Sequence, residues 1–243
     1  MLLAGVDLAW QSERNGTAVT IGELKASTLY VRAAYDQLRS LAEVQATIAA
    51  YQDMKGIAID APLIVRNEKG QRECEKLIGI AYGSRKAACH TSNLKLYPDP
   101  AGVRFAKHLN ALGFAHLGST EAAWQLECYP HPALIEIFGL PERLLYKKGS
   151  VAQKRAGQSR LAGLLLGLEK SEFLPLRFNR TFARRLDPAH SDMLRGTELK
   201  SNEDFLDSLV CLYIAGLYAM GVSERVYGSV EWGYIYVPER RCA

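Results

Sequence analysis

The chain has 243 residues, of which 48% are hydrophobic, and its formal net charge is +4. A chain of this length and composition is expected to bury the core of one large domain rather than to remain disordered. No stretch of about 18 apolar residues runs without a charged residue, so the sequence excludes a membrane-spanning helix.

The cysteines and the N-terminal residues indicate where the protein is expected to be found. The five cysteines, at positions 74, 89, 128, 211 and 242, are odd in number and irregularly spaced. This pattern argues against the disulfide framework of a secreted protein and favours free thiols. The apolar N-terminal stretch is interrupted by Asp7, and it has neither a basic region nor a small-residue cleavage site, which favours a strand over a signal sequence. We therefore expect a cytoplasmic protein that has no disulfides and does not bind a membrane.

The first sixty residues predict three strands, a helix and a fourth strand. Residues 2–10, 17–24 and 27–35 are short runs rich in β-branched and aromatic residues, and Asn15-Gly16 is a turn signal between the first two. Residues 36–51 place apolar side chains at helical spacing, and Asp36 is available as an N-cap. Residues 55–63 form a continuous apolar run that predicts a buried strand, most economically a parallel neighbour of the first.

The rest of the chain predicts an insertion followed by alternating strands and helices. Residues 63–120 lose regular strand character and carry nine Lys and Arg against four Asp and Glu. Residues 122–129 then predict a buried strand, and residues 132–140, 153–168 and 202–220 predict helices, the last apolar almost all the way round and hence buried. Residues 226–238 could form a closing hairpin or an irregular cover. The sequence thus predicts one α/β domain with an insertion at about 63–120.

Two acid-free basic segments lie in the second half of the chain. They are made up of Lys147, Lys148, Lys154, Arg155 and Arg160, and of Arg177, Arg180, Arg184 and Arg185. Either segment could follow a phosphate backbone, and a solvated helix face is an equally good interpretation. If the partner is a nucleic acid, we expect Lys147 and Lys148 to contact it.

Five acids interrupt segments that otherwise form core, which makes them candidate catalytic residues. They are Asp7 in the first strand, Asp60 at the end of the fourth, Glu127 in the fifth, and Asp204 and Asp207 near the start of the buried helix. Unpaired buried carboxylates are costly, so such acids require cations or hydrogen bonds. Carboxylate oxygens suit Mg²⁺ or Mn²⁺, and two such ions can activate a water and stabilise the leaving oxygen of a phosphodiester.

Some of these acids also have a structural explanation. Asp204, expected in the first turn of its helix, could stabilise the helix dipole. Asp60 precedes Ala-Pro and could be a turn acid at a strand end. Glu127 could equally make a structural hydrogen bond, and Asp207 could pair with an arginine. Asp7, in the middle of an apolar strand, is the hardest of the five to explain structurally.

The predicted strand order indicates where these acids lie relative to one another. If the first and fourth strands are parallel neighbours, Asp7 and Asp60 lie at the same end of the sheet, and the late helix packs beside them with Asp207 facing inward. Carboxylate oxygens of Asp7 should then lie within roughly 4–7 Å of those of Asp60 and Asp207, with Asp204 one helical turn nearer to solvent. At least one of these acids should have a raised pKa, because unneutralised acids repel each other.

An ordered set of segments resembles a known family. The segments GVDLAW, AIDAPL, RECEKL, ECYPHPAL, IFGL…YKKG and EDFLDSLVC resemble the domain of unknown function number 429, regarded as predicted ribonuclease-H-like nucleases. The resemblance spans nearly the whole chain. It implies an α/β fold with a ribonuclease-H-like mixed sheet (β-β-β-α-β-α-β-α), helices on both faces and an inserted segment. It also implies a metal-dependent nuclease that hydrolyses phosphodiester bonds of DNA or RNA.

The resemblance also assigns roles to particular residues. It implies Asp7, Asp60 and Asp207 as ligands of Mg²⁺ or Mn²⁺, with Asp204 as an alternative or additional ligand. Glu127 matches a family position without an assigned role. Arg72 and Glu75 of the RECEKL segment lie in the predicted insertion and are candidates for contacting substrate.

Other functions were compared with this one. A phosphotransferase or ATPase of the related actin-like fold would resemble a strand-Asp-Gly-Thr phosphate loop, whereas Asp7 is followed by Leu8 and Ala9. A zinc site built from Cys89, His90, Cys128 and His131 would lack standard finger or ribbon spacing. A Ser-His-Asp hydrolase is disfavoured because no G-x-S-x-G segment occurs. A nucleic-acid-binding module that keeps the fold without turnover stays open as the second hypothesis.

Overall fold

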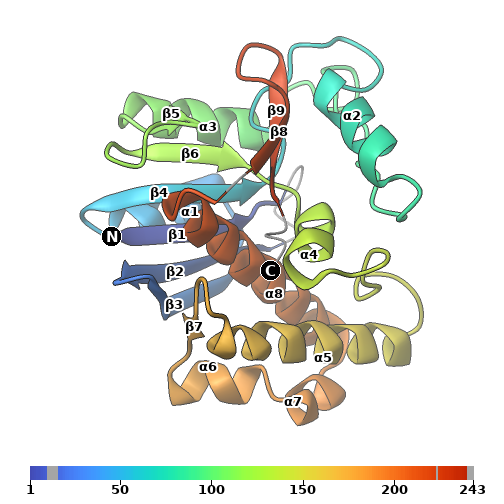
Figure 1. Cartoon of the computed structure of the whole chain (residues 1–243). Coiled ribbons are helices and arrows are strands. Elements are labelled where there is room, and N and C mark those ends of the chain that lie inside the picture. Colours follow the sequence, from blue (N-terminus) through green and yellow to red (C-terminus); the bar gives the residue numbers. More distant parts are fainter. Residues whose placement is uncertain (10–15, 223, 240–243) are drawn as a thin grey trace.

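A seven-stranded mixed sheet forms the centre of the molecule (Figure 1). The computed structural model describes residues 1–9, 16–222 and 224–239, so the predicted turn at Asn15-Gly16 and the end of the first predicted strand at Trp10 fall partly outside the described residues. In spatial order the strands are β5 (Ala115–His116), β6 (Trp124–Glu127), β4 (Met54–Asp60), β1 (Leu2–Asp7), β2 (Thr17–Lys25), β3 (Thr28–Leu38) and β7 (Leu176–Arg177).

The strand directions identify the fold. Strand β2 runs antiparallel to both of its neighbours, whereas β1, β4 and β6 are mutually parallel. A β1-β2-β3 meander followed by a helix and a strand that returns beside β1 is the ribonuclease-H-like arrangement. The prediction that the first and fourth strands are parallel neighbours is therefore confirmed.

Helices cover both faces of this sheet. In chain order they are α1 (Leu41–Ala49), α2 (Glu73–Tyr82), α3 (Ala101–Ala111), α4 (Pro130–Phe138), α5 (Val151–Gly167), α6 (Arg180–Arg185), α7 (Pro188–Met193) and α8 (Gly196–Ala219), with a short 3₁₀ turn at Leu168–Lys170. The C-terminal hairpin joins β8 (Glu224–Ser229) to β9 (Gly233–Pro238), so the hairpin alternative for the tail is confirmed. Among the described residues, no helix is long and apolar enough to cross a membrane.

The two faces of the sheet carry separate hydrophobic cores. On one face, α8 lies across β1, β2 and β4 and packs with α4, α5 and the C-terminal hairpin (Figure 1). On the other face, α1 and α3 contribute Val44, Ile48, Phe105 and Leu109 to a smaller core with the opposite side of β1 and β4. The predicted insertion at 63–120 contains α2, α3 and the edge strand β5.

Helix α8 contacts the sheet without an intervening side chain at Gly5 of β1. A Cβ at this position would lie 2.1 Å from both Leu212 N and Ser208 O of the α8 backbone. Beside this contact, the hydroxyls of Ser208 and Thr20 are hydrogen-bonded at 2.6 Å. The close approach fixes α8 along β1 and determines where its acids lie.

Two sequence-based boundaries need correction. The predicted helix at 36–51 begins at Leu41, because β3 continues through Asp36 and Ser40 supplies the N-cap in a capping box with Glu43. The last long helix begins at Gly196, so Asp204 lies more than two turns inside α8 and not in its first turn. A dipole or capping role therefore does not explain Asp204.

Candidate functional site

Asp7 and Asp60 end two adjacent parallel strands in the same register. They are paired residues at the C-terminal ends of β1 and β4. Because consecutive strand residues face opposite sides of a sheet, paired residues of parallel neighbours point to the same face. Both carboxyl groups open into one cavity of about 530 Å³.

This cavity, called the acidic pocket below, has acids at its base and cations around them. Leu8, Ala9 and Gly16 line it beside β1, and Tyr97, Tyr129 and His131 line another part of it. Its charged lining residues are Asp7, Asp60 and Asp204 together with Arg143, Lys147, Lys148 and Lys200. It therefore contains three of the predicted acids and both of the lysines predicted to contact substrate.

Asp204 and Asp207 approach the pocket from α8 and differ in exposure. Asp204 lines the pocket, pairs with Lys200 Nζ at 2.6 Å, and is close enough to Asp7 for the two carboxyl groups to influence each other's pKa. Asp207 is 0% exposed and lies behind the lining. The predicted relative depth of the two acids agrees with this arrangement.

The Asp207 carboxylate is held by two consecutive residues of the loop before α5. Its Oδ1 accepts a hydrogen bond from the Tyr146 hydroxyl at 2.6 Å. Its Oδ2 lies 2.7 Å from Lys147 Nζ. The cationic partner of Asp207 is thus a lysine and not the arginine that the sequence left possible, and this lysine also lines the pocket.

The acids of the pocket raise each other's pKa values. Burial, followed by the charge of Asp207, raises the pKa of Asp7 well above its usual value, and Asp204 and Asp60 add to this rise. Burial is also the main cause that raises the pKa of Asp60 to about 7, with Lys147 opposing the rise. The predicted rise in the pKa of at least one acid is therefore present.

Asp7 and Asp60 differ from the acids of α8 in their partners. Asp204 pairs with Lys200 and Asp207 pairs with Lys147, whereas Asp7 and Asp60 make no ion pair among the described residues. These two carboxyl groups are therefore the ones that are available as ligands for a divalent ion. Hard oxygen donors of this kind suit Mg²⁺ or Mn²⁺. Among the described residues, however, no three acid, histidine or cysteine side chains are already arranged around a metal position.

The pocket lies within a segment that a family model recognises. The model described as "Protein of unknown function (DUF429)" matches residues 5–231. The chain belongs to this family. A search of the curated proteins found no match. Among solved structures, a fowlpox virus resolvase in complex with its substrate Holliday junction DNA is similar, with 11% identity, a TM-score of 0.39, and coverage of 91% of this chain and 97% of that chain.

The DUF429 segment RECEKL does not line the acidic pocket. Its Arg72 and Glu75 lie in a second, buried cluster with Glu127, and the three side chains are 1–3% exposed. The Arg72 guanidinium donates to Glu127 Oε1 at 2.6 Å and Oε2 at 2.9 Å, and its Nε donates to Glu75 Oε1 at 2.8 Å. Glu127 also accepts from the Leu63 backbone amide at 2.8 Å.

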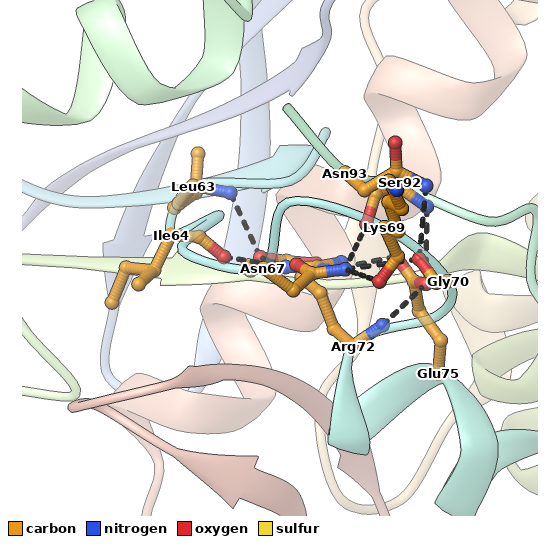
Figure 2. Close-up of polar contacts among 10 residues, drawn as sticks. Leu63, Ile64, Asn67, Lys69, Gly70, Arg72, Glu75, Ser92 and Asn93 are labelled. Carbon is orange, nitrogen blue, oxygen red and sulfur yellow. Dashed lines mark hydrogen bonds and ion pairs between the residues drawn. The ribbon is translucent and has the colours of Figure 1, made fainter. Parts of the chain in front are cut away.

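This second cluster ties the loop after β4 and helix α2 to the sheet. Figure 2 shows Arg72 and Glu75 beside the backbone of Ile64 and Ser92, which they bind at 3.1 Å each. One guanidinium and several backbone amides together hydrogen-bond both buried carboxylates, and burial leaves Arg72 and Glu75 without a surface that faces a substrate. Their predicted substrate contact, and a catalytic role for Glu127, are therefore not supported by the geometry, which favours the structural hydrogen bond considered for Glu127.

Several pocket residues were not singled out by sequence reasoning for this role. Tyr146 and Lys200 bind the acids of α8, and Arg143 adds a cation to the pocket wall. Lys200 and Asp204 are four residues apart, a spacing that indicates an ion pair on a helix. The contact of Tyr146 with Asp207 joins residues 61 positions apart and has no local signal.

His131 lines the pocket as a neutral residue. Burial, followed by the charge of Lys147, lowers the pKa of His131 to about 3. Its ring packs edge-on against Tyr146, and its buried Nδ1 has no hydrogen-bond partner among the described residues. The zinc alternative is not supported, because Cys128 faces Cys211 at 3.5 Å while Cys89, His90 and His131 form part of the pocket wall.

The second basic cluster lies away from the acidic pocket. Arg184 and Arg185 of α6 line a different cavity of about 440 Å³, which does not include the pocket acids. Arg185 is bound to Asp36 at 2.8 Å and stacks over the Phe205 ring at 3.8 Å. Of the two basic segments, the one at 146–160 is therefore the one that reaches the acids.

Proposed function

We propose that this DUF429 chain is a metal-dependent nuclease that hydrolyses phosphodiester bonds of nucleic acid in the acidic pocket. The observation that carries the proposal is that three carboxyl groups, those of Asp7, Asp60 and Asp204, line one pocket at the ends of β1 and β4 together with four cationic side chains. A cluster of this kind combines groups that bind a divalent ion with groups that attract a phosphate.

Asp7 and Asp60 would hold the ion, with Asp204 as a third ligand. Because the described side chains are not arranged around a metal position, and Asp204 pairs with Lys200, Asp204 would have to give up this ion pair to bind the ion through the same oxygen. When bound, a divalent ion supplies a Lewis acid and lowers the pKa of water. The donor set fits this role in charge and in atom type.

The other pocket residues would contact the substrate. Lys147, Lys148 and Arg143 place positive charge in the pocket, where it would attract a phosphate. His131 is neutral over the physiological pH range because of its lowered pKa, so it can accept a hydrogen bond through a ring nitrogen but is too weak a base to take up a proton. Tyr97 and Tyr129 offer aromatic rings against which a base could stack.

The test is a cleavage assay on labelled single-stranded, duplex and junction substrates of DNA and RNA, with Mg²⁺, Mn²⁺ or EDTA. We expect divalent-dependent cleavage that is abolished in Asp7→Asn, since an amide keeps the shape of the side chain but loses the charge that holds the ion. Asp192→Asn, an exposed acid of α7 outside the pocket, is the matched control and should cleave normally. Cleavage in EDTA, or by Asp7→Asn, would contradict the proposal.

The non-catalytic binding module remains the second candidate. It is favoured by the observation that no three acid, histidine or cysteine side chains of the described residues are already arranged around a metal position. If the chain binds nucleic acid but cleaves none of the substrates with either ion, this second function replaces the first.

A further inference from the structure

Asp207 has a partner on each carboxylate oxygen, one through a hydrogen bond and the other through an ion pair. One carboxylate oxygen accepts a hydrogen bond from Tyr146, and the other lies 2.7 Å from Lys147 Nζ. The side chain is 0% exposed and does not line the acidic pocket. A metal ion could reach Asp207 only by displacing Lys147.

Lys147 occupies the position that such an ion would need. Its side chain lines the pocket and keeps 28% of its surface exposed. Its charge acts on Asp7, Asp60 and Asp207 together. In a two-ion centre, carboxylates hold a second metal ion that neutralises charge at the reacting phosphate. In this pocket, the positive charge that acts on these carboxylates is the ammonium group of Lys147.

The Lys147 ammonium also has donors left for a substrate. An ammonium group has three N–H donors. Lys147 Nζ forms an ion pair with Asp207 Oδ2 at 2.7 Å, but this oxygen accepts no hydrogen bond from the described residues, so the contact leaves the donors of Lys147 for the pocket that its side chain lines. Tyr146 and Asp207 fix the position of the ammonium, because Tyr146 is 0% exposed and binds the opposite oxygen of the same carboxylate.

From this geometry we infer that the acidic pocket is a one-ion centre in which Lys147 takes the place of the second metal ion and contacts the substrate phosphate. Asp207 is then a positioning residue for Lys147 and not a metal ligand, and Asp7 and Asp60 are left to hold the single ion. The inference rests on the proposed nuclease function and replaces the two-ion expectation from the sequence.

The first test counts bound ions and needs no substrate. Isothermal titration with Mn²⁺ at pH 8, checked by the electron paramagnetic resonance signal of free Mn²⁺, should give one ion per wild-type chain. Lys147→Met should bind two, because Asp207 becomes available as a ligand. Lys148→Met is the matched control: Lys148 also lines the pocket but forms no ion pair with an acid among the described residues, and this variant should still bind one ion.

The outcomes separate this inference from the proposed function. Two ions per wild-type chain, or one per chain in Lys147→Met, would overturn the inference and leave a nuclease intact. No ion bound to the wild type, together with no divalent-dependent cleavage, would overturn both. Lys147→Arg keeps the positive charge and should bind one ion, so two ions in this variant would also count against the inference.

A double variant covers the case in which Lys147→Met does not fold. Lys147→Met with Asp207→Asn removes both charges of the pair and avoids leaving a buried carboxylate unpaired. It should fold, bind one Mn²⁺, and lose about 10²- to 10³-fold in kcat, the usual effect of removing one preorganised group that stabilises developing charge. Turnover at the wild-type rate would refute the assignment of Lys147 to the phosphate.

Discussion

The Asp60 carboxyl group makes the stability of this protein depend on pH in a defined direction. Burial is the main cause that raises its pKa from the usual 3.8 to about 7, and the negative charges of Asp207 and Glu127 add to the rise, while Lys147 and Lys200 oppose it. A carboxyl group whose pKa is higher in the folded than in the unfolded state binds its proton more tightly when folded. The contribution of this group to the free energy of unfolding is therefore most favourable below about pH 4, and it is lost as the pH rises to about 7.

The magnitude follows from the size of the pKa rise. A rise of about 3 units at about 1.36 kcal/mol per unit corresponds to at most about 4 kcal/mol of free energy of unfolding, lost between about pH 4 and pH 7. Asp60→Asn removes the titrating group, so the variant does not lose this free energy of unfolding as the pH rises. We expect the variant to be more stable than wild type at pH 8 by up to about 4 kcal/mol, and to have nearly the same stability at pH 4. For a chain of this size, about 1 kcal/mol corresponds to about 2–4 °C in melting temperature.

Urea unfolding of wild type and Asp60→Asn, at pH values from 4 to 8 in EDTA, measures this difference. Asp192→Asn is the control, since Asp192 is exposed and lies outside the pocket, and its free energy of unfolding should follow that of wild type at every pH. Adding Mn²⁺ at pH 8 should stabilise wild type more than Asp60→Asn. The electrostatic account of the pocket would be refuted if the free energy of unfolding of Asp60→Asn exceeded that of wild type by the same amount at pH 5 and pH 8, or did not exceed it at pH 8.

Further predictions concern the buried cluster, the basic rim and the packing of α8. Arg72→Met should lower the free energy of unfolding by about 3–5 kcal/mol, because it leaves Glu127 buried and unpaired. The control is Arg32→Met, which removes an exposed pair with Glu23 and should cost less than about 1 kcal/mol in the same urea assay. Lys148→Glu should weaken nucleic-acid binding and flatten its dependence on salt, measured by fluorescence anisotropy at increasing NaCl; binding insensitive to salt would contradict this. Gly5→Ala should give little folded protein by circular dichroism, because the added Cβ would lie 2.1 Å from the α8 backbone.

The sequence predicted those parts of the fold that depend on local patterns. The apolar runs around Asp7 and Asp60 are each long enough for one strand, and a parallel return beside the first strand follows from the helix between them. The Ser40-Glu43 capping box was also present in the sequence, and it gives the correct start of α1 where Asp36 does not. The start of α8 was missed because its first two turns are polar, although the spacing of Lys200 and Asp204 is helical.

The parts of the site that could not be predicted are contacts between distant segments. The acids were recognised because each interrupts an apolar element, a property that Glu127 shares with Asp60. Their partners, however, come from elsewhere in the chain. Glu127 forms an ion pair with Arg72, 55 positions away, whereas Asp60 forms no ion pair among the described residues. Local sequence cannot distinguish a buried acid that has a partner of its own from one that does not.

Helix α8 links the stability of the fold to the chemistry of the pocket. Ser208 and Leu212 pack onto Gly5 of β1, so α8 cannot shift along the sheet without losing this contact. Asp207 directly precedes Ser208 on the same helix and Asp204 lies one turn before it, which holds both acids beside the ends of β1 and β4. The close packing therefore keeps like charges together that would otherwise separate, and their repulsion lowers the stability of the ion-free protein. A divalent ion in the pocket would relieve this repulsion, so its binding should raise the stability of the domain as well as supply the charge that hydrolysis needs.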